Sequence, residues 1–359
     1  MNRVSGLAST IAVAVGQLPT TRYRGSKRRH AATIGTALVL ARPRRLYDAF
    51  GGSGTVSVLA DRLGISAQYS DIYHWTTTCA RTLLVNTYER RNLRKALERV
   101  DLAIQNARTG FVSSAFDDCY FTKAENLELD GLLNLLRREE SRRVHDLIFY
   151  GVAQAALAKL PMSMFHRACL KQRTADVERR AGNLAIWSTP FRVLVPRFME
   201  EAVMFTWIRR MRHVVIRGDA VDTVPSLEGD EALFLDPPYV NPCGDAPTYA
   251  EAYHFLEGFA LGEVRWRRGL TYEKSHPIYV NCTDSDFESG QGWIDGIRTL
   301  VDAGSAATIL ATARQRDVPG ARQLGRLLRA RFSVVRRRTI SETTLFSEKP
   351  NKEYLFVAS

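Results

Sequence analysis

The sequence has few cysteines and no long apolar run. The five cysteines are scattered over 359 residues, and no two of them have the spacing of a metal site. An odd number of cysteines in a chain of this length does not suggest a disulfide framework, so a reducing, cytoplasmic compartment fits best and no metal is predicted. No apolar run approaches the ~18 residues that a membrane-spanning helix needs. The cysteines are Cys79, Cys119, Cys169, Cys243 and Cys282.

The N-terminal segment contains only a short apolar stretch. Residues 11–15 are apolar, and the segment before them holds a single arginine, Arg3. A signal peptide is the alternative, but its apolar region is normally longer than this one. We therefore expect residues 1–20 to pack on the domain that follows.

Acidic residues are outnumbered by basic ones. Fifty Lys and Arg against 38 Asp and Glu leave a formal net charge of +12. A surplus of this size favours a polyanionic partner, because neutralising phosphates releases condensed counterions. The alternative is a protein that is basic without any such partner. Basic clusters recur along the whole chain, which has no internal repeat and no low-complexity tract, so a charged groove for nucleic acid is plausible.

The order of expected elements indicates an α/β fold with an open parallel sheet. Residues 44–64 read as a strand, a glycine-rich turn and a helix, and a second strand ends at Asp71. Residues from about 100 to 210 have apolar residues at helical spacing and little strand character. Strand-like segments then return. They are 213–219, 232–236, 277–284, 306–313, 332–340 and 353–359.

This order predicts a divided domain with an insert. Residues 1–98 would form the first part of the α/β domain, 99–212 a mainly helical insert, and 213–359 the second part of the domain.

Two segments near the first strands could bind a nucleotide-like cofactor. The stretch DAFGGSG, residues 48–54, places Gly51, Gly52 and Gly54 between a strand and a helix, where backbone N–H groups can face a ligand. Asp71 could accept hydrogen bonds from the two ribose hydroxyls of an adenosine-containing ligand. A plain glycine-rich turn and a helix N-cap are the structural alternatives.

The stretch DPPY, residues 236–239, follows a buried apolar strand. Ligands of open α/β sheets bind beyond the carboxyl ends of the strands. Pro237 and Pro238 stiffen the turn and remove two donors, so Asp236 and the Pro237 carbonyl are fixed acceptors. Tyr239 adds a flat surface on which a base could stack. Two acceptors and an aromatic face suit an exocyclic amine on a flat ring.

From residue 20 to the end, the chain resembles the Dam-like DNA adenine-N6 methyltransferases, particularly those of restriction–modification systems. DPPY after an apolar strand, preceded by F-x-G-x-G, is typical of amino-methyltransferases that use S-adenosylmethionine, and YHFLEG at 253–258 is typical of this branch. The other resembling segments are TRYRGSKRR, YSDIY, CYFTKAENLELDGLL and MSMFHRACL.

The resemblance implies a fold and a set of site residues. The fold would be a Rossmann-like methyltransferase sheet, mostly parallel with one antiparallel strand, and the helical insert would be a target-recognition domain. Asp71 would hold the ribose, and Lys27 would lie near the cofactor carboxylate. Asp236, Pro237, Pro238 and Tyr239 would be catalytic and receive the target adenine, with Asp236 also beside the cofactor. The remaining cofactor residues would be Tyr23, Asp48, Phe50, Gly52 and Gly54.

The resemblance also implies the reaction and the partners. A methyl group would pass from S-adenosylmethionine to the N6 amine of an adenine flipped out of duplex DNA, because that base cannot be reached inside the duplex. A cognate restriction endonuclease is a further partner that the sequence leaves open, and the enzyme would be a monomer or weak dimer. Methylation of cytosine N4 or of an RNA base, and an inactive DNA-binding subunit, are the alternatives.

Two further segments have two interpretations each. Tyr249 and Tyr253 are four residues apart and could line the wall of the site or pack in the core. His166 and Arg167 could contact phosphate or belong to a structural segment.

Overall fold

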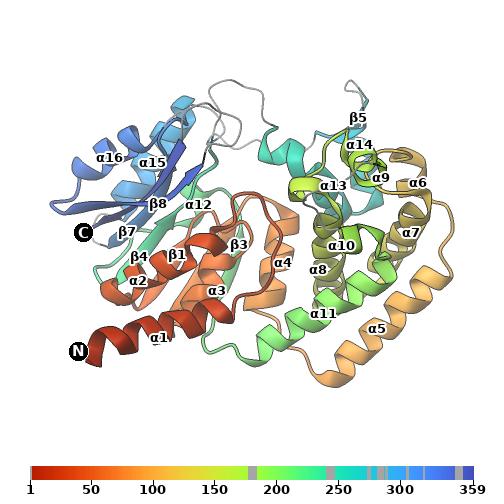
Figure 1. Ribbon diagram of the computed structural model, residues 1–359, viewed down its shortest axis with the longest axis horizontal. Helices are drawn as coiled ribbons and strands as arrows, with labels where there is room; N and C mark the ends of the chain where they lie inside the picture. The colour runs from red at the N-terminus through yellow and green to blue at the C-terminus, as the bar shows by residue number, and fades with distance from the viewer. Residues whose placement is uncertain are drawn as a thin grey trace.

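The computed structural model describes the chain with several gaps. A seven-stranded sheet has the order β3-β2-β1-β4-β7-β9-β8 within the part described (Figure 1). The strands are β1 Arg45–Asp48, β2 Ser66–Asp71, β3 Val214–Arg217, β4 Glu231–Leu235, β7 Thr308–Arg314, β8 Val335–Thr343 and β9 Asn351–Ala358. The described residues are 2–176, 184–239, 247–272, 276–280, 287, 290–304, 307–317, 320–343 and 351–359.

The sheet is mostly parallel, as predicted. Strands β3, β2, β1, β4 and β7 pair in parallel, and β9 runs antiparallel to both of its neighbours, β7 and β8. Among the described strands of this sheet, β9 is the one that is reversed. The order places β4 at the centre of the sheet, so the turn that follows β4 opens between the ends of β1 and β7.

Both faces of the sheet are covered, which explains why its central strands are apolar runs. Along β4, Ala232 and Phe234 belong to one core cluster and Leu233 and Leu235 to the other, because successive side chains point to opposite faces. The first cluster contains residues of α2 Ala31–Ala41, α3 Thr55–Arg62 and α4 His74–Leu84. The second contains residues of α12 Ala220–Thr223, α15 Gly290–Ala303 and α16 Ala321–Arg329.

The first twenty residues fold onto this domain, as expected. Helix α1, Asn2–Gly16, packs against α2 and α3. Ile11 and Ala14 are buried on its inner face. The Ile11 side chain lies beside Gly35 of α2, 3.5 Å from where a Cβ atom on Gly35 would be. No helix among the described residues is long and apolar enough to cross a membrane.

The segment between α4 and β3 is helical, as predicted. It lies beside the sheet and forms the right half of the view in Figure 1. Its helices are α5 Arg90–Gln105, α6 Phe111–Ala115, α7 Lys123–Arg138, α8 Arg142–Lys159, α9 Cys169–Thr174, α10 Leu184–Ser188 and α11 Phe191–Trp207, with a short 3-10 turn at Pro161–Ser163.

Two later helices also join this helical half. Phe255 of α13, Tyr249–Leu261, packs edge-on against Phe121 and stacks on Phe165. Trp266 of α14, Glu263–Gly269, contacts Phe111. Residues that precede β4 in the sequence and residues that follow it therefore both contribute to the helical half. The division of the chain into three parts at residues 98 and 212 stays a prediction.

The expected strand at 277–284 does not join the main sheet. Ile278–Tyr279 form β6, which pairs antiparallel with β5, Leu270–Thr271, in a separate two-stranded sheet. The backbone N–H of Tyr279 donates to His254 Nδ1 of α13, at 3.1 Å. This bond and the packing of α13 on β6 attach the segment to the helical half. Residues 281–284 lie outside the described residues.

Candidate active site

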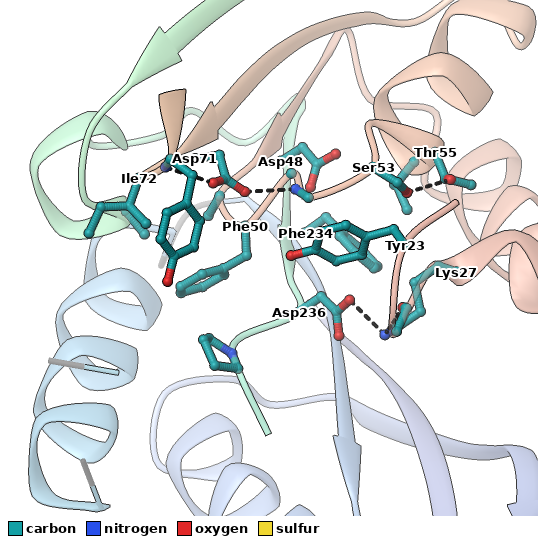
Figure 2. A pocket seen from close by; sticks show the side chains of 18 of the residues that line it. Tyr23, Lys27, Asp48, Phe50, Ser53, Thr55, Asp71, Ile72, Phe234 and Asp236 are labelled. Atoms are coloured by element: carbon teal, nitrogen blue, oxygen red, sulfur yellow. Dashed lines mark hydrogen bonds and ion pairs between the residues drawn. The ribbon is translucent and has the colours of Figure 1, made fainter. Parts of the chain in front are cut away.

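A cavity opens at the carboxyl ends of the central parallel strands, and its empty space, including the solvent at its mouth, is about 790 Å³. The turns after β1, β2 and β4 contribute to its walls, together with Tyr23, residues 25–27 and one side chain of α13. Figure 2 shows Asp71 and Asp236 reaching it from different strands. Of the predicted residues, Tyr23, Lys27, Asp48, Phe50, Gly52, Asp71, Asp236 and Pro238 line the cavity, whereas Gly54, Pro237 and Tyr239 do not.

The glycine turn after β1 needs glycine for two different reasons. Gly52 and Gly54 have positive φ angles of 48° and 72°, which favour glycine. At Gly51 a Cβ atom would lie 2.1 Å from the Tyr69 ring, and at Gly52 it would lie 3.0 Å from the Tyr23 ring. Gly54 is the N-cap of α3, so it shapes the turn from outside the cavity.

Asp71 joins the glycine turn to helix α4. One carboxylate oxygen accepts from the Gly52 N–H at 2.9 Å. The other accepts from the Tyr73 N–H at 3.0 Å and from Thr76 Oγ1 at 2.7 Å, but the N-cap of α4 is Tyr73, so Asp71 is not the helix N-cap of the structural alternative. Asp71 also faces the cavity, and burial raises its pKa. The Asp71 carboxylate thus holds the glycine turn in place and also forms part of the cavity wall.

Asp48 is a second buried carboxyl on the cavity wall. Its Oδ2 accepts a hydrogen bond from Ser57 Oγ at 2.7 Å. Burial, assisted by the negative charges of Asp236 and Asp71, raises the pKa of Asp48 to about 7, although the Ser57 bond acts in the opposite direction. A cationic group beside Asp48 would stabilise the charged form and lower this pKa.

Both oxygens of Asp236 already have partners. Oδ2 lies 2.6 Å from Lys27 Nζ. Oδ1 accepts from Thr312 Oγ1 at 2.6 Å and from the Tyr239 hydroxyl at 3.0 Å. The side chain of Asp236 is 17% exposed and lies at the cavity (Figure 2). The carboxylate is therefore held in one orientation by three donors.

The rest of the DPPY turn faces partly away from the cavity. Pro237 is buried, and Pro238 lines the cavity. The Tyr239 hydroxyl donates to Asp236 and lies 3.1 Å from Glu353 Oε1, and the guanidinium of Arg314 lies 4.7 Å from the ring centre. The face of this ring that Arg314 covers is not open to a base in the described arrangement.

Lys27 is a buried cation between two carboxylates. Its ammonium lies 2.6 Å from Asp236 and 3.4 Å from Glu353. Burial alone would lower the pKa of Lys27, but these two negative charges raise it above its ordinary value. Lys27 belongs to the short 3-10 helix Lys27–His30, which leads directly into α2.

An aromatic stack forms the wall between the sheet and the helical half. The Tyr23 ring stacks on Tyr253 at 5.1 Å and on Tyr249 at 5.8 Å. Tyr249 lines the cavity, whereas Tyr253 is buried and its hydroxyl accepts from the Arg24 N–H at 2.7 Å. Tyr249 therefore lines the wall of the site and Tyr253 packs in the core, so each of the two interpretations holds for one tyrosine. A capping box between Thr248 and Glu251 starts the helix that carries them.

The other polar residues of YHFLEG support the structure. His254 is buried between Tyr120 and the Tyr279 N–H, and burial lowers its pKa to about 3. Glu257 accepts from the backbone N–H groups of His74 and Trp75 at the start of α4. The motif thus ties α13 to α4 and β6.

His166 and Arg167 lie outside the residues that line the cavity. Phe165, just before them, donates its N–H to Ala252 O of α13 at 2.9 Å. Arg167 is exposed, whereas burial lowers the pKa of His166. The contact places this segment against α13, and its phosphate contact stays a prediction.

Sequence reasoning missed three residues around Asp236. Thr312 and Arg314 belong to β7 and Glu353 to β9, and all three contact Asp236 or Tyr239. One sequence signal could have pointed to Glu353, because it is an acidic residue at the start of the mainly apolar expected strand 353–359.

The described cysteines are free thiols. Cys79 and Cys169 are buried and Cys119 is partly buried. Among the described residues no group of His, Cys, Asp and Glu is arranged to hold a metal ion. Cys243 and Cys282 lie outside the described residues.

Comparison with known proteins points to methyltransferases. No family model matches the chain. The chain is similar to the type II methyltransferase M2.HphI of Haemophilus parahaemolyticus, with 26% identity over 258 residues. The match covers 69% of this chain and 73% of that protein. This similarity and the sheet order agree with a Rossmann-like methyltransferase fold.

Proposed function

We propose that this protein is a site-specific DNA methyltransferase that transfers a methyl group from S-adenosylmethionine to the N6 amine of adenine. The observation that carries the proposal is the position of Asp236, a carboxylate at the end of the central strand, in the same cavity as the glycine turn and Asp71. The similarity to a type II methyltransferase supports the methyl donor and a DNA substrate.

The cavity fits an adenosine-containing cofactor. Gly52 would let the ligand approach the backbone, because it lines the cavity and has no side chain. Asp71 would accept from the ribose hydroxyls, and the buried carboxyl of Asp48 would suit a cationic group of the ligand. When bound, S-adenosylmethionine supplies an electrophilic methyl group on a sulfonium.

Asp236 and the Pro237 carbonyl would act on the target amine. The lone pair of an adenine amino nitrogen is delocalised into the ring, so the nitrogen is a poor nucleophile. Hydrogen bonds from its two N–H groups to Asp236 and to the carbonyl of Pro237, which does not line the cavity in the ligand-free protein, would localise that lone pair. The negative charge of Asp236 would stabilise the positive charge that develops on nitrogen during transfer. Holding the amine in line with the methyl group supplies much of the remaining rate.

The target base would have to leave the duplex to reach this cavity. Extrusion costs a few kcal/mol, which stacking on an aromatic ring partly offsets. Tyr239, which bonds to Asp236, and Tyr249, which lines the cavity, are aromatic residues that could serve. Because the Arg314 guanidinium and the Lys27 ammonium both lie over the Tyr239 ring, stacking there requires a ring face that neither cation covers.

The remaining assignments extend this proposal. The helical insert would carry the surface that reads the DNA sequence, and the net charge of +12 would favour the phosphate backbone. A partner restriction endonuclease, a cytoplasmic location and a monomer or weak dimer complete the proposal.

Nucleoside analysis tests the proposal. The purified protein is incubated with S-adenosylmethionine and unmodified duplex DNA, and the DNA is digested and separated by chromatography. We expect N6-methyladenine. Methyl groups on cytosine alone would overturn the adenine assignment in favour of cytosine N4. Failure to bind S-adenosylmethionine in calorimetry would favour an inactive DNA-binding subunit.

A further inference from the structure

Glu353 of β9 lies at the centre of a buried polar cluster beside the cavity. Its side chain is 8% exposed. Its oxygens lie 3.4 Å from Lys27 Nζ, 3.1 Å from the Tyr239 hydroxyl and 3.2 Å from Ser341 Oγ. Burial alone would raise the pKa of Glu353, but the charges of Lys27 and Arg314 hold it below its usual value. Glu353 is therefore a buried anion that contacts neighbours of the proposed catalytic carboxylate.

In the ligand-free protein the partners of Asp236 occupy the oxygens that the target amine would need. Lys27 occupies Oδ2 at 2.6 Å, and Thr312 and Tyr239 occupy Oδ1. A neutral amine competes poorly with an ammonium for a carboxylate, because charge-assisted bonds are roughly twice as strong as neutral ones. An ammonium at that position would also repel the positive charge that develops on the target nitrogen. Lys27 must therefore leave Asp236 before the amine can bind there.

We propose that Glu353 is a positioning residue that takes Lys27 from Asp236 when the target base enters the cavity. The inference rests on the proposed function. Glu353 is already within ion-pair distance of the same ammonium, so the transfer exchanges one carboxylate partner for another. It frees Oδ2 of Asp236 for the amine and neutralises Lys27 beside the developing charge.

The Tyr239 hydroxyl makes this exchange easier. It lies 3.0 Å from Asp236 Oδ1 and 3.1 Å from Glu353 Oε1, so its single proton can be donated to either carboxylate. As Lys27 moves to Glu353, the hydroxyl can keep its bond to Asp236, and Thr312 continues to hold the same oxygen. The net charge of the cluster stays the same throughout, because Lys27 only moves from one carboxylate of the cluster to another.

Glu353→Gln tests the inference, since it removes the charge and keeps the shape of the side chain, with one oxygen that can still accept from Tyr239 or from Ser341. We measure single-turnover methylation of DNA that the wild type methylates, KM for that DNA, and the affinity for S-adenosylmethionine by calorimetry. We expect the transfer rate to fall roughly 100-fold, while both binding constants change less than about threefold. Glu353→Asp, which keeps the charge but withdraws it from Lys27, should lose roughly tenfold.

Glu231→Gln is the matched control. Glu231 is also buried and accepts from a tyrosine and a cation, Tyr47 and Arg44, but at the opposite end of β4 from Asp236. Its variant should methylate at the wild-type rate. Wild-type rates in both Glu353 variants, or a loss explained by weakened binding of the cofactor, would overturn the inference alone. A wild-type protein that transfers no methyl group to adenine would overturn the proposed function as well.

Discussion

Asp236 is the residue on which the proposed methyl transfer depends most. It lies at the end of β4, and Thr312 and Tyr239 hold its Oδ1, so its orientation is set before any substrate arrives and does not depend on Lys27 staying at Oδ2. Fixed acceptors aimed at a developing charge contribute more than acceptors that must reorganise during the reaction.

Asp236→Ala should separate turnover from binding. The variant removes the carboxylate that would hold the amine, and leaves the glycine turn and Asp71 in place. We expect methyl transfer to fall roughly 10³-fold or more, with DNA affinity nearly unchanged. Filter binding and single-turnover methylation measure the two quantities on the same preparation. An unchanged transfer rate would rule out Asp236 as the acceptor.

Asp48 should make the stability of the ligand-free protein depend on pH. Its pKa rises from 3.8 to about 7 on folding, so its favourable contribution is complete below about pH 4 and is lost as the pH rises through about 7. At about 1.4 kcal/mol per pKa unit the loss is at most roughly 4 kcal/mol. Asp48→Asn should abolish this dependence, so the variant becomes the more stable protein above neutral pH.

Chemical denaturation from about pH 4 to about pH 8 measures this effect. Ser57→Ala provides the comparison, because the Ser57 hydrogen bond lowers the pKa of Asp48 and its removal should move the loss to higher pH. Parallel pH profiles for the wild type and Asp48→Asn would contradict the assignment.

At the scale of elements, the glycine turn is the part of the site that tolerates least change. Gly52→Ala adds a Cβ atom 3.0 Å from the Tyr23 ring at a φ of +48°, on the surface of the cavity. We expect the affinity for S-adenosylmethionine to fall at least about tenfold, as measured by calorimetry.

Gly64→Ala is the control for backbone strain. Gly64 has a φ of +78° after α3, and an added Cβ would meet nothing within 4 Å. This variant should lose a similar amount of stability, roughly 1 kcal/mol, and keep its affinity for the cofactor. Equal loss of affinity in both variants would show that the effect is global.

The elements that could be predicted from sequence are those with a local signal. The strand before DPPY combines an apolar run with turn residues at its end, and β1 leads directly into the glycine turn, so the order and types of these elements were readable. The run at 277–284 is similar in composition, but partner choice depends on tertiary contacts, and Ile278 and Tyr279 pair with β5 instead of the main sheet.

The contacts around Asp236 could not be predicted for a related reason. Thr312 and Glu353 reach Asp236 and its neighbours only because β7 pairs with β4 and β9 pairs with β7. Those pairings join residues far apart in the sequence, and no local pattern specifies them. The ion pair between Lys27 and Asp236 likewise depends on the fold, whereas the resemblance had placed Lys27 near the cofactor.

For the whole molecule, the positive charge should control DNA affinity. If six to ten phosphates are neutralised, affinity should fall by roughly 10³ to 10⁵ between about 50 and about 200 mM salt. Fluorescence anisotropy with a labelled duplex measures the slope of affinity against salt. An affinity that does not change with salt would contradict a role for the net charge of +12.

A crystal structure with a duplex and a non-reactive cofactor analogue tests the central claim most directly. We predict that an Asp236 oxygen lies about 2.7–3.2 Å from the amine of an extruded adenine, with the Pro237 carbonyl as the second acceptor. An extruded base that contacts neither of these oxygens, with Asp236 still paired to Lys27, would contradict the account.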